Sequence, residues 1–592
     1  MKKSILRKLI AGTAAVIMAA LPTASEYSGL KATETQAAPD SYHDDWLHVN
    51  DKAQIVDMNG NEVWLTGVNW FGYNVGSQIF DGAWSANVHH CLDLIADHGF
   101  NLLRVPMSTQ ILLQWKNREP DPIIKLNEYE NPELTIEGVV GGKPMYSFDI
   151  WNQVVAWCRE NGIKIMMDIH SATTNAAGHN YALWYDPNYS TDDWLEALAW
   201  FADCYKDDDT IIAIDLKNEP HGKTDDGIYA KWDGSSDENN WRYAAERGAK
   251  ACLDQNPNLL IMVEGIEVYP KFEEGESWAS HSVDYSRYPW SPYHGAWWGA
   301  NFRGAREFPV DLGEHQSQLV YSPHDYGPEV WKQDWFYLED ESKTFTRETL
   351  LDDYWYDTWA YLVEEQVAPL LMGEWGGWVD DAHDKTGENR HWLQEIRDYM
   401  IDKHIHHTFW CFNENSSDTG GLVYDNFQKW DDVKYEFVKP ALWQDGNGKF
   451  ISLDHTIPLG TAGNGISLSD YYGGGNTTPQ TTTTAKPVET TTTTTKPAET
   501  TTTTTDSKTT VPNDIVYGDA NCDGDISLAD AVLILQYVAN PDKFGIDGSD
   551  KNHMTKAGKE NADCNLSRDG ITSADALAVQ KYLIKLVTLP VE

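Results

Sequence analysis

The chain has 592 residues and a strongly acidic composition, with 45 lysines and arginines against 91 aspartates and glutamates and a formal net charge of −46. A field of that sign repels nucleic acids, anionic membranes and acidic polysaccharides, which excludes a DNA-binding role. Residues 39–476 carry about −43 of this charge, so the acidity belongs to one large folded region. The 26 tryptophans and 29 tyrosines offer many flat rings, which suit a neutral, ring-shaped ligand such as a sugar.

Residues 1–38 have the pattern of an export signal followed by a short N-terminal segment. Four basic residues precede an apolar run over residues 9–21, which is too short to span a bilayer but fits the core of a signal peptide. Small residues allow cleavage anywhere between residues 24 and 38. Because no other long apolar run follows, we expect a secreted, extracellular protein without a membrane span.

Residues 477–510 separate two folded parts of the chain. They contain 20 threonines in 34 residues, with a ten-residue repeat that begins at Lys486 and again at Lys496. Such a sequence has no apolar face to bury and cannot offset its own conformational entropy, so we expect a disordered Thr/Pro linker. The linker divides the chain into a large region, 39–476, and a small region, 511–592.

The large region alternates short apolar runs with amphipathic stretches. The stretches 88–98, 150–160 and 241–253 are expected to form helices on the outside of a sheet. This alternation predicts a parallel sheet, and eight such units predict an α/β fold of the (β/α)8 TIM barrel type with insertions in several loops. The predicted strands are 63–69, 100–106, 163–170, 210–217, 259–264, 319–325, 369–374 and 407–412.

Polar side chains close nearly every predicted strand. In a barrel of this type, such residues point into an active site at the C-terminal face. Two carboxylates from different strands, with an arginine, two histidines and an asparagine converging on them, are what glycoside hydrolysis requires. The residues concerned are Arg104, His170, Asn218, Glu219, His324, Tyr326, Glu374 and Trp410.

The expected surroundings give Glu219 and Glu374 different roles. If Glu374 is bonded to Arg104 and Tyr326, it stays anionic at neutral pH. Glu219 would face the charge of Glu374, which favours the protonated form of Glu219. We therefore predict that Glu219 is the acid.

The stretch 212–220 (IAIDLKNEP) resembles the signature of glycoside hydrolase family 5, a group of retaining (β/α)8 glycosidases. Other motifs resemble, in order and spacing, the endo-β-1,4-glucanase branch of that family. They are LTGVNWFG from Leu65, FNLLRVP from Phe100, MDIH from Met167, WWGANFRG from Trp297, YSPHDY from Tyr321, GEWG from Gly373 and FWCFNENSSDTGGL from Phe409. The resemblance covers residues 45–460.

This resemblance implies a role for each strand-end residue. Glu219 would be the acid/base and Glu374 the nucleophile, while Asn218 would hold the 2-hydroxyl of the sugar at the cleaved bond. The supporting residues would be Arg104, His170, His324 and Tyr326, and the sugar-stacking platforms Trp70, Trp298 and Trp410. The implied mechanism is a retaining double displacement, which needs no cofactor and requires carboxyl groups roughly 5 Å apart. Cys411 and Phe412 stand where relatives often have serine and tryptophan.

The small region contains a twelve-residue calcium loop, 519–530. Aspartate, asparagine and aspartate at positions 1, 3 and 5 converge on a hard cation, glycine at position 6 permits a sharp turn, and aspartate at position 12 closes the coordination sphere. A second loop, 563–575, has one residue more, so that Ser567 or Asp569 must supply the fifth-position ligand. We expect one or two Ca²⁺ ions, held by Asp519, Asn521, Asp523, Asp525, Asp530, Asp563, Asn565, Ser567, Asp569 and Asp575.

Each calcium loop precedes a helical stretch, and the tandem pair resembles a type I dockerin over residues 515–590. A dockerin is a small all-α module of paired EF-hand-like loop-helix motifs, and the resemblance implies that it docks the chain into a cohesin module of a cellulosome scaffold protein. The family reads its partner at the positions of Leu528, Ala529, Ser573 and Ala574. A calcium-stabilised fold without a partner is the alternative.

Together these features predict a secreted endo-β-1,4-glucanase that hydrolyses internal bonds of cellulose, with a monomeric catalytic region and a dockerin that tethers it to a scaffold. One alternative is the same fold and mechanism acting on another neutral β-glycan, such as mannan, xylan, lichenan or xyloglucan. Another is a catalytically silent subunit that only binds glycan. The presence of both Glu219 and Glu374 argues against a silent subunit, and the motif around Trp410 favours cellulose.

Overall fold

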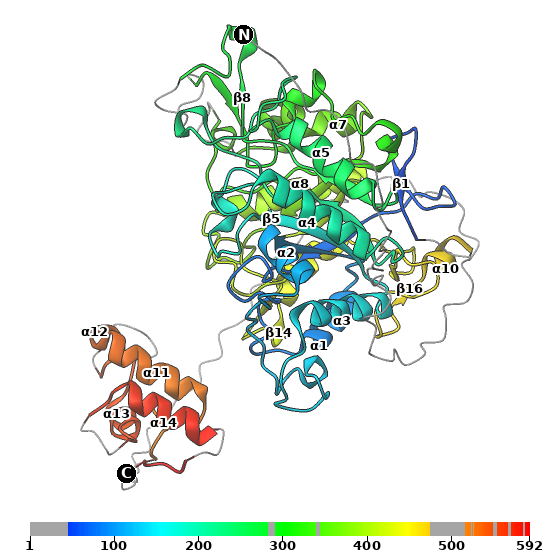
Figure 1. The fold of residues 1–592 in the computed structure, drawn as a ribbon. Coiled ribbons are helices and arrows are strands. Elements are labelled where there is room, and N and C mark those ends of the chain that lie inside the picture. Colours follow the sequence, from blue (N-terminus) through cyan, green and yellow to red (C-terminus); the bar gives the residue numbers. More distant parts are fainter. Residues whose placement is uncertain are drawn as a thin grey trace, which may run out of the picture. The chain divides into compact units, whose positions relative to one another are not determined.

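The computed structural model describes residues 45–281, 291–338, 344–473 and 516–591, the last range with gaps at 523, 525, 547, 549–552, 566–569 and 584–586. The predicted signal segment, 1–38, and the Thr-rich linker, 477–510, lie outside these residues. The described residues form two compact units, one before the linker and one after it (Figure 1). Within the described ranges, no helix has the length and apolar character needed to cross a membrane.

Eight parallel strands form the centre of the first unit, and each corresponds to one of the predicted strands. They follow the order β10-β7-β6-β5-β4-β3-β12-β11, and bridges from Tyr321 to Leu370 and from His324 to Glu374 join the two end strands into a closed barrel. The predicted barrel architecture of this region is therefore confirmed. The strands are β3 (Thr66–Asn69), β4 (Leu102–Ser108), β5 (Lys164–Ser171), β6 (Ile211–Asp215), β7 (Leu260–Val263), β10 (Leu319–Tyr321), β11 (Leu371–Trp375) and β12 (His406–Phe409).

Alternate residues of each strand face the barrel interior or the surrounding helices. On β4, Leu103 and Val105 belong to the large apolar core that includes the helices, whereas Leu102 belongs to a smaller core with Met166 of the neighbouring strand. All seven residues of β4 are buried, as expected for a strand that is covered on both faces. Arg104 has the same parity as Leu102, so its side chain points into the barrel.

Amphipathic helices surround the barrel and bury one face against it (Figure 1). The predicted helices at 88–98, 150–160 and 241–253 correspond to α1, α3 and α5. Polar side chains fix where helices begin: Asn87 accepts a hydrogen bond from the amide of His90 in α1, and Ser190 and Asp193 form a capping box at the start of α4. The helices are α1 (Val88–Asp97), α2 (Thr109–Asn117), α3 (Ser147–Glu160), α4 (Thr191–Cys204), α5 (Trp241–Leu253), α6 (Arg347–Leu350), α7 (Tyr361–Glu364), α8 (Glu388–Lys403), α9 (Asp432–Val438) and α10 (Leu468–Gly473).

Short strand pairs lie outside the barrel of the first unit. The pair β1 (His48–Val49) and β2 (Ile55–Val56) precedes the barrel, and β15 (Phe450–Ile451) and β16 (Gly465–Ile466) follow it. The loop after β7 contains a hairpin of β8 (Val268–Pro270) and β9 (Tyr293–Gly295), and the loop after β12 contains β13 (Val423–Tyr424) and β14 (Lys429–Trp430). Because these two loops follow barrel strands, both hairpins extend from the C-terminal face of the barrel.

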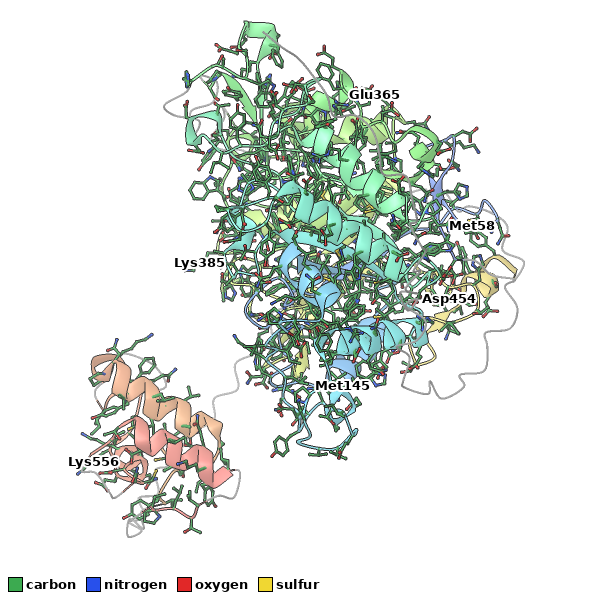
Figure 2. All side chains as sticks on the ribbon, viewed as in Figure 1. Met58, Met145, Glu365, Lys385, Asp454 and Lys556 are labelled. Atoms are coloured by element: carbon green, nitrogen blue, oxygen red, sulfur yellow. The ribbon has the colours of Figure 1, made fainter. Side chains whose placement is uncertain are left out.

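A cluster of charged residues joins the beginning and the end of the first unit at the N-terminal end of the barrel. Nζ of Lys164, the first residue of β5, lies 2.7 Å from Oδ2 of Asp45 and 3.6 Å from Oδ2 of Asp454, which is labelled in Figure 2. The ring of His455 lies 2.6 Å from Asp45 through Nδ1 and 3.0 Å from Asp57 through Nε2. We call these five residues the basal cluster. Burial alone would lower the pKa of His455, but its hydrogen bonds to Asp45 and Asp57 raise it to about 9.

Alkaline pH is expected to weaken the basal cluster. The pKa of His455 is about 9 in the folded protein and about 6.5 in an unfolded chain, so the stability that it contributes is complete below pH 6.5 and is lost as the pH rises through 9. Between pH 7 and pH 9.5 we expect the Tm of the first unit to fall by about 2–4 °C more in the parent than in His455→Gln. Calorimetry at the two pH values measures the difference, and an equal fall in both proteins would contradict the prediction.

The second unit is a small helical assembly in its described part. Helix α11 begins at the end of the loop 519–530, and α14 begins at the end of the loop 563–575. These two helices pack together around Ala531, Ile534, Ala576 and Val579, all buried. The helices of this unit are α11 (Leu528–Ala539), α12 (Pro541–Phe544), α13 (Lys556–Ala562) and α14 (Ser573–Leu583).

Candidate active site

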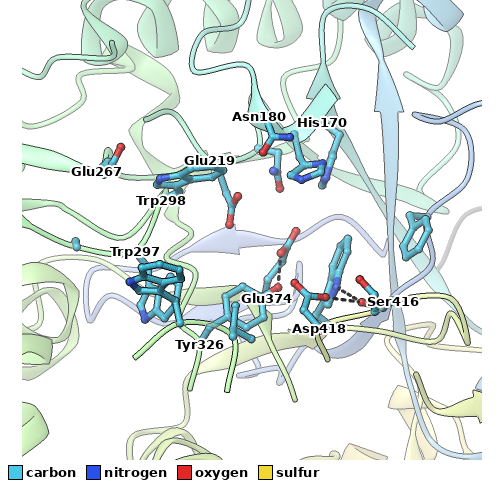
Figure 3. Close-up of a pocket in the computed structure, with 18 of the residues that line it drawn as sticks. His170, Asn180, Glu219, Glu267, Trp297, Trp298, Tyr326, Glu374, Ser416 and Asp418 are labelled. Carbon is cyan, nitrogen blue, oxygen red and sulfur yellow. Dashed lines mark hydrogen bonds between the residues drawn. The ribbon is translucent and has the colours of Figure 1, made fainter. Parts of the chain in front are cut away.

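A cavity of about 830 Å³ opens at the C-terminal ends of the barrel strands, where the strand-end pattern predicts a site (Figure 3). Its lining includes Glu219, from the loop after β6, and Glu374, from β11, and these side chains face each other. On one side of this pair lie Trp297, Trp298 and Glu267, and on the other lie Ser416 and Asp418. The cavity is therefore a cleft with the two glutamates near its middle.

Glu374 is held in place by two hydrogen-bond donors. Its Oε1 accepts a hydrogen bond from Nη1 of Arg104 at 2.9 Å, and its Oε2 accepts one from the hydroxyl of Tyr326 at 2.5 Å. Only 4% of Glu374 is exposed, so these two bonds replace hydration and fix the orientation of the carboxylate. Both partners expected from the sequence are thus in contact with Glu374, and donors of this kind suit an ionised carboxylate.

Glu219 follows β6 in a left-handed backbone conformation, with a φ of +50°. Its Oε1 lies 3.0 Å from Nδ1 of His324. Burial alone would lower the pKa of His324, but the carboxylates of Glu264, Glu374 and Glu219 raise it well above its ordinary value. The ring therefore contacts one oxygen of Glu219 and leaves the other oxygen free of this contact. From the sequence we expected only Glu374 as a charged neighbour of Glu219, and the contact with His324 was not predicted.

The two catalytic candidates are close together. One carboxylate oxygen of Glu219, one of Glu374 and a ring nitrogen of His324 all lie within 4.8 Å of one another. Carboxyl groups about 5 Å apart are typical of retaining glycosidases, whereas inverting enzymes separate theirs by roughly 6.5–9.5 Å to admit a water molecule. The geometry therefore suits attack by one glutamate while the other handles a proton.

Arg104 is fully buried and organises the floor of the cavity. Besides Glu374, its Nη2 bonds to Oδ2 of Asp215 at 2.9 Å and to Oδ1 of Asn218 at 3.1 Å. Burial alone would lower the pKa of Arg104, but the surrounding carboxylates, Asp168 foremost, raise it well above its ordinary value. A permanent cation thus fixes Glu374 and Asn218, the neighbour of Glu219, relative to each other.

His170, the predicted supporting residue at the end of β5, lines the cavity. Its Nδ1 lies 2.7 Å from Oδ2 of Asp168. Burial holds the pKa of His170 well below its ordinary value, so the ring is neutral and donates from Nδ1 to Asp168. The ring also stacks on Trp410, with centroids 6.0 Å apart. His170 therefore presents an acceptor nitrogen at a fixed position in the cavity wall.

Two of the three predicted sugar platforms line the cavity. Trp298 stacks on His221 with ring centroids 3.8 Å apart and an interplanar angle of 5°. Trp410 stacks on Phe71 with centroids 5.5 Å apart and an angle of 14°. Each indole is therefore supported by a second ring and partly exposed, which is the arrangement that lets a flat face pack against a sugar.

The structure corrects the prediction for Trp70. Its ring is completely buried, stacked on Phe80 at 4.0 Å and tilted against Phe412 at 4.7 Å, and its indole N–H donates to the carbonyl of Asp81. With both ring faces covered, Trp70 has no surface to offer to a sugar. The reason is its parity, because Trp70 continues the alternation of Val68, which faces the core between the barrel and the helices.

Glu264 is a buried residue of this site that the sequence analysis did not name. Its Oε2 accepts a hydrogen bond from the amide of Glu219 at 2.7 Å, and its Oε1 lies 3.1 Å from Nε2 of His324 and 3.3 Å from Nη2 of Arg104. Burial raises the pKa of Glu264 well above its ordinary value. Glu264 closes the predicted strand 259–264, so the pattern that identified the other strand-end residues applied to it as well.

Loop residues complete the cleft. The insertion 267–310, with the β8–β9 hairpin, forms one wall, whereas the insertion 115–148 contributes none of the described lining residues. Aromatic residues that the strand-end pattern does not reach also line the cavity, namely Phe71, Tyr293, Trp297 and Trp331. Cys411 and Phe412, which depart from the family pattern, are fully buried and lie outside the lining.

The first predicted calcium loop has carboxylates bonded to its own backbone. Oδ2 of Asp519 accepts a hydrogen bond from the amide of Gly524 at 3.2 Å. Asp530 accepts bonds from the amides of Asn521 at 3.0 Å and Ser527 at 2.8 Å. The acidic residues at both ends of the loop are thus drawn toward its backbone, and such a set of oxygen donors fits a hard divalent cation.

The second loop repeats this pattern, since Asp575 accepts bonds from the amides of Asn565 and Thr572, both at 2.8 Å. Asn521 and Ser527 are six positions apart and Asn565 and Thr572 seven, so the extra residue lies between Asn565 and Thr572. The predicted ligands Asp523, Asp525, Ser567 and Asp569 lie outside the described residues.

The predicted partner-reading residues occupy matching places in the two halves of the second unit. Leu528 and Ala529 begin α11, and Ser573 and Ala574 begin α14. Ala529 is exposed.

Comparison with known proteins gives consistent results. Residues 56–416 match the model of the family Cellulase (glycosyl hydrolase family 5). Endoglucanase G of Acetivibrio thermocellus is 45% identical over 89% of this chain and 91% of its own length, and Endoglucanase B of the same organism is 41% identical over 85% and 86%. A solved structure of an endocellulase from Pyrococcus horikoshii with cellotetraose is similar to the first unit, with a TM-score of 0.55, 28% identity, and coverage of 67% of this chain and 98% of that chain.

Two tryptophans that look alike in the sequence should differ in their effect on stability. Trp70→Ala removes a completely buried ring, so we expect a loss of about 3–5 kcal/mol in the free energy of unfolding. Trp298→Ala removes a partly exposed ring at the cavity, and we expect a loss of no more than about 2 kcal/mol. Urea unfolding of the two variants and the parent measures both values, and equal losses would refute the assignment of Trp70 to the core.

Proposed function

Because this chain belongs to glycosyl hydrolase family 5 and is an endoglucanase, we propose that it hydrolyses internal β-1,4-glucosidic bonds of cellulose with retention of the anomeric configuration. The observation that carries the proposal is the facing pair of Glu219 and Glu374. One carboxylate oxygen of Glu219 lies within 4.8 Å of one carboxylate oxygen of Glu374. The cellotetraose complex of the similar endocellulase supports a β-glucan chain as the ligand.

In the first step, Glu374 attacks the anomeric carbon of the sugar at the cleaved bond. The bond from that carbon to the glycosidic oxygen breaks, and Glu219 gives its proton to the departing oxygen, so that a glycosyl ester on Glu374 forms. Arg104 and Tyr326 hold the Glu374 carboxylate in place for the attack. His324, on one oxygen of Glu219, leaves the other oxygen to deliver the proton.

In the second step, Glu219 has lost its proton and acts as a base. It takes a proton from a water molecule as the oxygen of that water attacks the anomeric carbon, which releases Glu374 and returns the proton to Glu219. Two inversions at one carbon give net retention. We assign Asn218 to the 2-hydroxyl of this sugar, and Trp298 and Trp410 to stacking against the glucan chain.

The choice of glycan is tested by a hydrolysis panel with the full chain. We expect rapid loss of viscosity with few new reducing ends on carboxymethyl cellulose, because internal cuts shorten a polymer quickly. Mannan, xylan, lichenan and xyloglucan are the comparison substrates, and a preference for one of them would keep the mechanism and replace the substrate. Proton NMR of the fresh product reports the anomer, and an α-anomer as the first product would refute retention.

Substitution of the two glutamates tests their roles. We expect Glu374→Gln to lower kcat on cellulose by about three orders of magnitude or more while binding of cellotetraose persists, because the amide keeps the shape of the side chain and loses the nucleophile. Glu219→Gln should behave in the same way on cellulose. Glu365→Gln, an exposed glutamate that pairs with Arg306, is the matched control and should retain parental kcat. Substantial hydrolysis by Glu374→Gln would overturn the assignment of the nucleophile.

We further propose that the chain is secreted and tethered. In this proposal residues 1–38 hold the signal, 39–476 the catalytic region, 477–510 the linker and 511–592 a dockerin that binds a cohesin module. Its support is the paired loop-helix arrangement, in which Asp530 and Asp575 make the same backbone contacts. When bound, Ca²⁺ would tie each loop to the start of the helix that follows it.

Calcium binding is tested by titration of Ca²⁺ into the EDTA-treated full chain. We expect Asp530→Asn to weaken binding at the first loop by about tenfold or more, because a carboxylate that closes the coordination sphere becomes a neutral amide. Glu560→Gln, an exposed residue of α13, is the matched control. Capture by an immobilised cohesin module should require Ca²⁺ and be lost in EDTA. Calcium binding without capture would favour a stabilising role with no partner.

A further inference from the structure

A closed ring of contacts connects Glu264 with both the main chain and the side chain of Glu219. Oε2 of Glu264 accepts the main-chain N–H of Glu219 at 2.7 Å. Oε1 of Glu264 lies 3.1 Å from Nε2 of His324, and Nδ1 of the same ring lies 3.0 Å from Oε1 of Glu219. The Glu264 side chain therefore bonds the backbone of Glu219 directly and lies against the His324 ring that contacts the Glu219 carboxyl group.

The backbone of Glu219 needs such support. Its φ of +50° is uncommon for a residue with a side chain, and such a conformation persists only where neighbouring groups hold it. The bond from its amide to Oε2 of Glu264, at 2.7 Å, gives a buried backbone donor the partner that it needs. Glu264 thus stabilises the conformation that aims the Glu219 side chain into the cavity.

The chain leaves room for Glu264 only because residue 299 is glycine. A Cβ atom on Gly299 would lie 2.2 Å from Oε2 of Glu264 and 3.4 Å from Cα of Glu219. The φ of Gly299 is +77°, which a side chain would also disfavour. The loop that carries Trp298 into the cavity therefore passes directly over the contact between Glu264 and Glu219.

Glu264 lies beneath the cavity and does not line it. It is fully buried, and it is not among the described residues that line the cavity. The charges that face the ring come from several strands. Arg104 comes from β4, Asp215 from the end of β6 and Lys217 from the loop after it. His324 follows β10, and Glu374 belongs to β11. Glu264 can therefore influence the reaction only through its neighbours.

We propose that Glu264 is a positioning residue for Glu219, which sets the direction in which the Glu219 carboxyl group delivers its proton. It does so by bonding the amide of Glu219 and by contacting His324, whose ring contacts one oxygen of Glu219 and leaves the other oxygen to deliver the proton. This inference rests on the proposed acid/base role of Glu219. The loss of Glu264 should therefore weaken proton delivery and leave attack by Glu374 intact.

The dependence on the leaving group distinguishes this role from a structural one. The departing sugar of cellotetraose needs a proton, whereas 2,4-dinitrophenolate departs without one. For Glu264→Gln we expect kcat/KM on cellotetraose to fall about 10- to 100-fold, a part of the usual contribution of general acid catalysis. On 2,4-dinitrophenyl β-cellobioside we expect kcat/KM within about threefold of the parent, since only attack by Glu374 limits that step. The KM for cellotetraose should change little.

Two further variants keep the test independent of how well Glu264→Gln folds. Gly299→Ala keeps the Glu264 side chain and displaces its carboxyl group, so it should show the same selective loss on cellotetraose. Asp325→Asn is the matched control, because Asp325 is a fully buried carboxylate next to His324 in the sequence that bonds to Trp359. We expect Asp325→Asn to change the rates on both substrates in equal proportion. Calorimetry of each variant reports its folding.

Equal losses on both substrates for Glu264→Gln and Gly299→Ala would overturn the inference and leave Glu264 as a structural residue, and so would parental rates on both. The proposed function fails differently. If Glu219 is not the acid/base, Glu219→Gln itself will lose as much on the dinitrophenyl substrate as on cellotetraose. The comparison of Glu219→Gln with Glu264→Gln therefore shows which of the two assignments is at fault.

Discussion

A single buried guanidinium connects the fold of the first unit with its chemistry. Arg104 is completely enclosed, and its partners come from β3, β5, β6 and β11 and from the residues that follow β6 and β7. Moving a cation out of water costs several kcal/mol, which only close opposite charges offset. The strands can therefore close around Arg104 only in the register that brings their carboxylates to it. The closure of the barrel and the placement of Glu374 depend on the same set of contacts.

The polar residues of the site form two layers, one that lines the cavity and one that is buried beneath it. The upper layer lines the cavity and includes Glu219, Glu374 and His170. The lower layer, which contains Arg104 and Glu264, is fully buried and does not line the cavity. A proton can move between the protein and a substrate only in the upper layer. The lower layer keeps the positions of the upper one constant while the charge changes.

The barrel and most of its site residues could be predicted because two periodicities are visible in the sequence. Apolar runs alternate with amphipathic stretches, and polar residues such as Arg104 and Glu374 close those runs at one edge of the sheet. The prediction for Trp70 is wrong because Trp70 lies one residue beyond the end of β3. Only the alternation of side chains that continues from Val68 shows that Trp70 faces the helices. The contact of His324 with Glu219 joins residues that are 105 positions apart, so it cannot be predicted from the spacing of residues in the sequence. Glu264 followed the pattern, but a glutamate after a strand is also common as a cap or an ion-pair partner.

The basal cluster has a consequence for the order in which the chain is made. His455 bonds to Asp45 across 410 positions, and Lys164 lies between them in the sequence. During synthesis from the N-terminus, Asp45 and Lys164 leave the ribosome long before Asp454 and His455 exist. Until then the ammonium of Lys164 lacks its contact with Asp454, and Asp45 lacks its contact with His455. The last barrel strand, β12, ends at Phe409, so all eight strands can be present before Asp454 and His455, which lie in the last tenth or so of the region 39–476, complete the basal cluster.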